Sequence, residues 1–373
     1  MDELSNFIKE IIQSVKVSKP NFNLTSLAIF TNLQQLHIRR KQLVDVSPLA
    51  SLTKLEELHL GSNCIDDVSP LSSLINLKHL SLCCNQIIDV SPLETVVNLK
   101  ELNLDSNQIV DISPLTSLRN LIELDLSCNQ IVEVTPLATL IKIEKLRLDS
   151  NQIVDVSPLA SLIKLEVLNL NWNFISDVPP LESLANLEKL YLNSNQIVDL
   201  TVLAKLVNLG ELYLDSNEII DVSPLTSLTK LVVLSLNSNR VYDVSPLASL
   251  IKLEELRLYA NQIANISSLT SLINLVDLHL NSNEIRDVSP LTSLINLTRL
   301  NLEVNQIVDV SSLASLIKLE HLELNSNLIV DISPLSSLIN LEKLYLKSNP
   351  IVDIFPLESL VNLKHFDLIF PRR

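Results

Sequence analysis

Apolar residues return along the chain in a pattern that repeats every 22 residues. Within one repeat, residues 58–60 read leucine, histidine, leucine, which is the two-residue period of a short strand with one buried face. Ser69-Pro70 then opens a segment whose leucines stand three residues apart, at 71, 74 and 77. Serine is expected to cap the free N–H groups there, and proline suits the first helical position. The pattern therefore predicts coils made of a strand, a turn, a brief helical segment and a return.

An asparagine follows each predicted strand at the same place in the repeat. Fourteen of them stand 22 residues apart without an insertion or deletion: Asn63, Asn85, Asn107, Asn129, Asn151, Asn173, Asn195, Asn217, Asn239, Asn261, Asn283, Asn305, Asn327 and Asn349. A period of this length indicates stacked supersecondary units rather than a globule around one centre. The short amide can satisfy buried backbone N–H and C=O groups where the chain turns inward. These side chains are therefore interpreted as framework.

The repeated run Leu-x-x-Leu-x-Leu-x-x-Asn-x-Ile resembles the leucine-rich repeat family. The Asp-Val-Ser-Pro-Leu that follows it, at 67–71, 155–159 and 287–291, is most similar to the 22-residue internalin-like class. The phosphatase-regulator-like class shares the repeat length but usually lacks the Ser-Pro step. The resemblance implies an α/β solenoid, a right-handed superhelix with a parallel β-sheet on the concave side and short 3₁₀ or α turns on the convex side.

The two ends of the chain depart from the repeat. Apolar residues at helical spacing in 5–16 predict an amphipathic helix that shields the first coil. A membrane-surface helix is the alternative, disfavoured because the polar face is only weakly basic. We therefore expect an N-terminal helical cap and lead-in over 1–32 and a repeat array over 33–362. Residues 363–373 are expected to form a terminal strand and a short C-terminal tail, which either folds over the last coil or leaves an open edge strand.

The net charge of −15 comes from 43 acidic and 28 basic residues. Fourteen acids occupy one column of the repeat, which only Asn265 interrupts: Asp45, Asp67, Asp89, Asp111, Glu133, Asp155, Asp177, Asp199, Asp221, Asp243, Asp287, Asp309, Asp331 and Asp353. We expect each carboxylate to cap N–H groups of the turn that enters Ser-Pro, and a row of bound calcium ions is the alternative. The remaining charges balance, and no basic stripe exists, so nucleic acid is not expected as a partner.

Composition excludes several classes of protein. Gly61 and Gly210 are the only glycines, which excludes glycine-rich phosphate loops and dinucleotide fingerprints. No apolar run reaches the roughly 18 residues of a membrane span, and the N-terminus lacks the features of a secretory signal peptide. The four cysteines show no CxxC pairing and are interpreted as reduced thiols. These observations predict a cytoplasmic protein without a membrane partner.

No pairing of nucleophile and base, no HExxH and no pair of carboxylates stands out from the repeat. We therefore expect no enzyme activity and assign no catalytic residue. All six histidines map to predicted concave positions, and His37, His59 and His79 fall on three successive strands with Cys83 nearby. No carboxylate evidently completes a tetrahedral set around them, so solvated histidines are favoured. No metal site and no cofactor is assigned.

The residues beside the core leucines of each strand vary from repeat to repeat, while the framework is copied. Such variation suits a binding surface, and it suits neutral change at exposed positions equally. Aromatic residues make up only 3% of the chain, yet four of the five tyrosines map to predicted concave strands. An exposed aromatic cluster with arginines at its rim has the composition of a binding hot spot. The predicted protein-binding residues are Arg147, Val167, Trp172, Tyr191, Tyr213, Val233, Arg257 and Tyr259.

The sequence thus predicts a monomeric, non-catalytic scaffold that binds a protein partner on its concave sheet. A protein phosphatase regulatory subunit is one alternative, suggested by the shared repeat length, and co-purification of a phosphatase catalytic subunit would support it. A fragment of a secreted internalin-like adhesin is another, suggested by the Asp-Val-Ser-Pro-Leu resemblance although no export signal is visible. A designed consensus array is a third, and the scattered cysteines and irregular concave positions argue against it.

Overall fold

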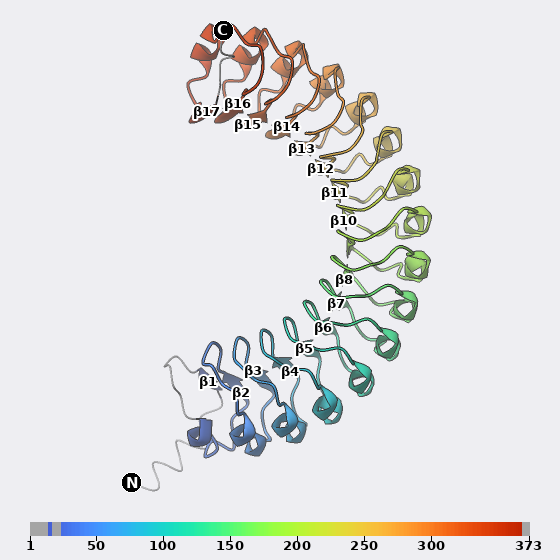
Figure 1. The fold of residues 1–373 in the computed structure, drawn as a ribbon, viewed down its shortest axis with the longest axis vertical. Coiled ribbons are helices and arrows are strands. Elements are labelled where there is room, and N and C mark those ends of the chain that lie inside the picture. The colour runs from blue at the N-terminus through green and yellow to red at the C-terminus, as the bar shows by residue number, and fades with distance from the viewer. Residues whose placement is uncertain (1–13, 17–23, 368–373) are drawn as a thin grey trace. The chain divides into compact units, whose positions relative to one another are not determined.

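The computed structural model describes residues 14–16 and 24–367 of the chain. The chain divides into two units, Met1–Leu187 and Glu188–Arg373, and each is a stack of coils. Each three-residue strand except the last described one is followed by one short 3₁₀ helix. Within each unit the strands line the inner side of the coils and the helices line the outer side (Figure 1). The predicted solenoid is therefore confirmed, with 3₁₀ helices on its convex side.

In the first unit the elements alternate as predicted. Their bounds are β1 (Ser14–Lys16), η1 (Leu24–Leu27), β2 (Gln35–His37), η2 (Ser47–Ser51), β3 (Glu57–His59), η3 (Ser69–Ser73), β4 (His79–Ser81), η4 (Ser91–Thr95), β5 (Glu101–Asn103), η5 (Ser113–Ser117), β6 (Glu123–Asp125), η6 (Thr135–Thr139), β7 (Lys145–Arg147), η7 (Ser157–Ser161), β8 (Val167–Asn169) and η8 (Pro179–Ser183). Consecutive strands from β1 to β8 pair in parallel.

The second unit continues the same alternation. Its elements are β9 (Lys189–Tyr191), η9 (Thr201–Lys205), β10 (Glu211–Tyr213), η10 (Ser223–Ser227), β11 (Val233–Ser235), η11 (Ser245–Ser249), β12 (Glu255–Arg257), η12 (Ser267–Ser271), β13 (Asp277–His279), η13 (Ser289–Ser293), β14 (Arg299–Asn301), η14 (Ser311–Ser315), β15 (His321–Glu323), η15 (Ser333–Ser337), β16 (Lys343–Tyr345), η16 (Phe355–Ser359) and β17 (His365–Asp367). These strands also pair in parallel, each with the next along the chain.

The core is a column of leucine, isoleucine and valine side chains that runs through each unit. The middle residue of each strand from β2 to β16 is buried, and in the second unit Leu190, Leu212 and Leu234 are register partners that are fully shielded from solvent. The buried leucine of each 3₁₀ helix from η2 to η15, such as Leu225 in η10, closes the coil from the other side. Because every coil buries apolar side chains at the same repeat positions, each coil packs on its neighbours and there is no single central core.

The repeat asparagines join neighbouring coils as predicted. The Asn151 amide donates to the carbonyl oxygens of Leu126 and Leu148, each at 3.0 Å. Its Oδ1 accepts from the N–H of Ile131 at 3.0 Å. One amide therefore satisfies backbone groups of its own coil and of the preceding coil, and the framework interpretation is confirmed.

The predicted serine cap is wrong, because the repeat aspartate caps the helix instead. Ahead of η3, the Ser69 N–H donates to Asp67 Oδ1 at 2.8 Å, and Ser69 Oγ donates to Oδ2 of the same carboxylate at 3.0 Å. The residue at the N-cap position is Val68, whose side chain has no polar atom to offer. Asn265 makes the equivalent backbone bond at 2.9 Å, so the one interruption of the column keeps the cap. The predicted capping role is thus confirmed for the aspartates that make this bond, such as Asp45, Asp221 and Asp353. It is wrong for Asp177, because Pro179 stands two residues on and has no N–H to donate.

Acid should weaken this capping. Hydrogen bonds from the backbone and side chain of Ser113 hold the pKa of Asp111 below its ordinary 3.8, and Asp155 and Asp243 behave alike. A carboxylate with a lowered folded-state pKa stabilises the fold above its ordinary pKa and loses that contribution as the pH falls through the lowered value. We expect the urea midpoint to fall steeply below about pH 4. A D111N/D155N/D243N triple variant, which keeps the cap as Asn265 does, should show a shallower fall, and an identical slope would contradict this assignment.

The ends differ from the prediction in part. The predicted helix over 5–16 does not extend over residues 14–16, because these form β1 and pair with β2. The rest of that helix, and the predicted tail beyond 367, lie outside the described residues. At the other end, Phe366 takes the place of the core leucine in β17 and pairs with Leu344 of β16. Among residues 14–16 and 24–367, no helix has the length and apolarity to cross a bilayer.

Candidate functional site

The outward surface of each strand consists of its first and third residues. Parallel pairing in register places these residues in two columns within each unit. The third-residue column is less open than the sequence suggests, since Ser235 is 0% exposed between the bulkier Tyr213 and Arg257. Asp277, at the first position of β13, is also buried. The variable positions therefore form an uneven surface in which small residues are covered by large ones.

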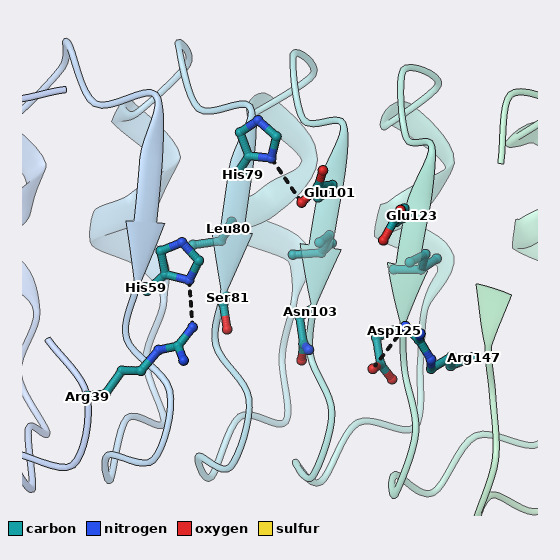
Figure 2. A pocket seen from close by; sticks show the side chains of 12 residues that line it. Arg39, His59, His79, Leu80, Ser81, Glu101, Asn103, Glu123, Asp125 and Arg147 are labelled. Carbon is teal, nitrogen blue, oxygen red and sulfur yellow. Dashed lines mark hydrogen bonds and ion pairs between the residues drawn. The ribbon is translucent and has the colours of Figure 1, made fainter. Parts of the chain in front are cut away.

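A shallow hollow of about 200 Å³ lies on the strand surface of the first unit, over β3 to β7 (Figure 2). Its rim alternates acids and bases that pair across strands. His79 Nδ1 lies 3.0 Å from Glu101 Oε2, and Arg147 lies 3.9 Å from Asp125. Lys145 forms an ion pair with Glu123, which raises the pKa of the lysine. The hollow is polar, and much of its charge is already compensated.

An acidic network lies at the edge of this hollow, where the strands lead into the next turn. Ser127 Oγ lies 2.6 Å from Asp125 Oδ1 and 2.7 Å from Asp149 Oδ1. Asn169 donates to the same oxygen of Asp149 at 2.8 Å. Burial raises the pKa of the neighbouring Asp105, and the charges of Asp125 and Asp149 add to that rise. These side chains hold one another in place and leave few free donors for a ligand.

Three of the predicted binding residues lie in the first unit. Arg147 ends β7 and is exposed, and Val167 opens β8 in register with Lys145. Trp172 follows β8 and is 67% exposed. Its backbone has a φ of 55°, the left-handed conformation that the equivalent residue of other coils also adopts, usually as serine. A bulky, solvent-exposed indole at such a position gains little from packing.

The other five lie in the second unit, and two of them form a stacked aromatic pair. The rings of Tyr191 and Tyr213 stack with centroids 4.9 Å apart and planes 9° from parallel. Tyr191 donates its hydroxyl hydrogen to Glu211 Oε2 at 3.3 Å, and Lys189 binds the other oxygen of that carboxylate at 2.6 Å. Burial raises the pKa of Tyr213, with the Glu211 charge adding to the effect. The two rings are therefore held in one orientation before any partner arrives.

Val233, Arg257 and Tyr259 extend this surface along the next two strands. Val233 is half-buried between Glu211 and Glu255, its register partners. Arg257 is tied to Glu255 by an ion pair of 2.6 Å. The expectation that Tyr259 lies on a strand is wrong, because β12 ends at Arg257. Tyr259 stands two residues further on, with its N–H bonded to Asn237 Oδ1 at 2.8 Å. Its ring is exposed next to the strand surface.

The structure therefore brings five predicted residues together in the second unit and three in the first. Sequence reasoning missed the cross-strand ion pairs beside them. Glu123 with Lys145, Lys189 with Glu211, and Asp277 with Arg299 all pair opposite charges 22 residues apart. The signal was present in the repeat, because residues at this spacing are neighbours on adjacent strands. Reading the first-residue column for alternating charge would have found it.

A family model described as "Leucine Rich repeats (2 copies)" matches the chain over most of its length. The matched residues are 31–73, 75–117, 97–142, 119–161, 141–183, 163–205, 185–227, 229–272, 251–293 and 295–337. These matches run from the coil of β2 to that of η15, and the elements from β16 to β17 lie beyond them. No curated protein sequence matches the chain.

Solved structures extend the comparison. An internalin from Listeria monocytogenes is 34% identical over 85% of this chain and 88% of its own, with a TM-score of 0.71. A leucine-rich repeat protein from Leptospira interrogans is 26% identical over 94% of this chain and 100% of its own, with a TM-score of 0.79. The plant peptide hormone receptor RGFR1, at 21% identity, shares the fold over 92% of this chain and 63% of its own, with a TM-score of 0.75.

Proposed function

Because the chain belongs to the internalin-like leucine-rich repeat family, we propose that it is a non-catalytic scaffold that binds a protein partner on its strand surface. The observation that carries the proposal is the stacked pair Tyr191–Tyr213 on β9 and β10. Val233, Arg257 and Tyr259 continue the same surface, and we call these five residues the aromatic patch. Tyrosine and arginine are the residues that dominate the centres of protein interfaces.

The aromatic patch is ordered before binding. The Tyr191 hydroxyl is fixed by Glu211, and the Glu211 carboxylate is itself fixed by Lys189. Ring stacking removes further freedom from both tyrosines. These side chains therefore lose little conformational entropy when a partner binds, and preorganisation of this kind raises affinity without adding contacts.

Charge pairing around the aromatic patch favours an apolar or mixed partner surface over a highly charged one. Lys189 is neutralised by Glu211, and Arg257 by Glu255. A partner that relied on charge alone would have to break these pairs. The rings, Val233 and the stems of the paired side chains offer contact area without that cost.

The breadth of the strand surface favours a macromolecular partner over a small molecule. Outward residues come from one strand after another at a spacing of about 4.8 Å, so even five strands present a surface about 20 Å across. The hollow in the first unit is lined mostly by charged and polar residues, whereas typical small-molecule sites are lined mainly by apolar ones. The receptor RGFR1 was solved in complex with RGF2, so the shared fold can carry a ligand in that protein.

Removing both stacked rings should weaken partner binding. In the Y191A/Y213A variant we expect the affinity for captured proteins to fall by more than about tenfold, because hot-spot truncations commonly cost 2 kcal/mol or more. Circular dichroism should not change, since both side chains lie outside the core. The measurement is a quantitative pull-down with mass spectrometry, followed by titration of the captured protein.

Tyr242 supplies the matched control, because it is an exposed tyrosine away from the strands, between β11 and η11. The Y242A variant should retain the captured proteins at the level of the unchanged chain. Equal capture by Y191A/Y213A and the unchanged chain would dismiss the aromatic patch. Cytoplasmic location and the monomeric state stay predictions, which fractionation and light scattering of the same sample can test.

A further inference from the structure

Two imidazoles and a carboxylate converge on the strand surface near the start of the first unit. His37 of β2 and His59 of β3 are register partners, and their rings stack with centroids 4.3 Å apart and planes 25° from parallel. Glu57 precedes His59 by two residues on β3, so the two side chains share the outward surface. Among the described residues, these three alone form a cluster of His, Cys, Asp or Glu whose potential ligand atoms all lie within 4.8 Å of one another.

The two rings point at the same atom. His59 Nε2 lies 2.6 Å from Glu57 Oε1, and His37 Nε2 lies 3.3 Å from that oxygen. The sequence suggested His79 and Cys83 as companions of the two histidines and offered no carboxylate. The structure places Glu57 between them, while His79 turns to Glu101. The two imidazole nitrogens and the carboxylate oxygen therefore offer two nitrogen ligands and one oxygen ligand to a common point.

We propose that His37, Glu57 and His59 form a binding site for a divalent transition-metal ion of the zinc class. Two imidazoles with one carboxylate are a ligand set that zinc, cobalt and nickel accept, whereas calcium and magnesium prefer oxygen ligands alone. Metal–nitrogen distances of about 2.0–2.1 Å require the two stacked rings to open toward the ion. All three side chains are partly exposed, so side-chain rotation alone can supply this movement.

The backbone supports this site, because both histidines lie on paired strands with fixed register. A neutral imidazole is the metal-binding form. The remaining coordination positions face solvent and would be filled by water.

The positive charge of Arg39 opposes a metal cation at this site, so the effect of removing Arg39 on metal affinity can be predicted. Its Nη2 lies 2.9 Å from His59 Nδ1. Arginine can only donate, so Nδ1 accepts and the ring proton sits on Nε2, facing Glu57. An ion at Nε2 must displace that proton, which moves to Nδ1 or to solvent, and the exposed guanidinium must turn away. Removing Arg39 should therefore strengthen metal binding, an effect that nonspecific surface binding would not show.

The test is calorimetric titration of the chelator-stripped full chain with zinc chloride, with cobalt absorption spectra as a second measurement. We expect one tight equivalent, weakened by more than about tenfold in H37A, H59A and E57Q, and equal or tighter binding in R39A. His279 gives the matched control, because it pairs with one carboxylate, Asp277, at 3.0 Å and the described residues add no second imidazole there. The H279A variant should bind zinc like the unchanged chain.

Two results would overturn the proposal. One is the same zinc affinity and stoichiometry in H37A or H59A as in the unchanged chain. The other is an equal loss in H279A, which would show that binding is spread over surface histidines. Unchanged circular dichroism of each variant ensures that a lost ion reflects a lost ligand. Neither result depends on whether the aromatic patch of the second unit binds a protein.

Discussion

Replacing Leu212 by alanine is expected to lower the free energy of unfolding by about 2–5 kcal/mol. Leu212 is the middle residue of β10 and is fully buried. Leu190 and Leu234 lie beside it in register, one on each neighbouring strand. The vacated space would be lined by copied side chains on both sides, which limits how far the coil can collapse to fill it. The loss should therefore include a cavity term as well as the lost transfer free energy.

Urea unfolding followed by circular dichroism measures this loss, and hydrogen exchange locates it. Because each coil contacts only its neighbours, amide protection should fall most in the coils next to β10. Ile251 provides the control, since it is an exposed aliphatic residue of the same unit. The I251A variant should change stability by less than about 0.5 kcal/mol. A melting curve of L212A that matches the unchanged chain would contradict the core assignment.

Replacing Asn151 by alanine is expected to cost at least about 1–3 kcal/mol, although the side chain is small. The amide serves the carbonyl oxygens of Leu126 and Leu148 and the N–H of Ile131. Alanine would leave these backbone groups buried without partners. Since the bonds link two coils, the N151A variant should also lower the cooperativity of unfolding in the first unit.

Asn186 is the matched control for that experiment. Its amide also donates to a backbone carbonyl of the preceding coil, Ile163 O at 2.8 Å, but it is exposed. Water can replace the lost bond there, so N186A should cost much less than N151A in the same denaturant titration. Equal losses in the two variants would mean that burial does not set the value of the asparagine.

The fold was predictable because each residue's direction follows from its place in the repeat. The alternation around Leu58 identified a strand, and the spacing from Leu71 to Leu77 identified a short turn. What periodicity could not decide was which of several neighbouring polar groups would bond. Ser69 and Asp67 are both able to cap a helix, and only the geometry of the 3₁₀ turn assigns the cap to Asp67. Outside the repeat the argument failed, as β1 shows where a helix was predicted.

The candidate site was predictable only as columns of residues. Spacing placed Tyr191 beside Tyr213, and the structure shows the two rings stacked. Spacing alone could not show that Ser235 is covered by larger neighbours, because coverage depends on the size and rotamer of side chains on adjacent strands. The contact of Glu57 with His37 has the same origin, since a carboxylate can turn along its own strand or across to the next. Tyr259 was misplaced because strand length is set by backbone bonding rather than by spacing.

The asparagine bonds also bear on how such a chain can change its size over generations. Repeat asparagines such as Asn107 and Asn283 donate to the carbonyls of their own coil and of the coil before it. Unequal crossing-over between two copies of the repeat, kept in phase, would join the first half of one to the second half of another. The junction would form one intact repeat with all of its asparagine bonds, rather than a disrupted repeat. Gain or loss of whole copies is thus a mutation that this architecture tolerates. One such event gives the outward side chains new neighbours on the adjacent strands.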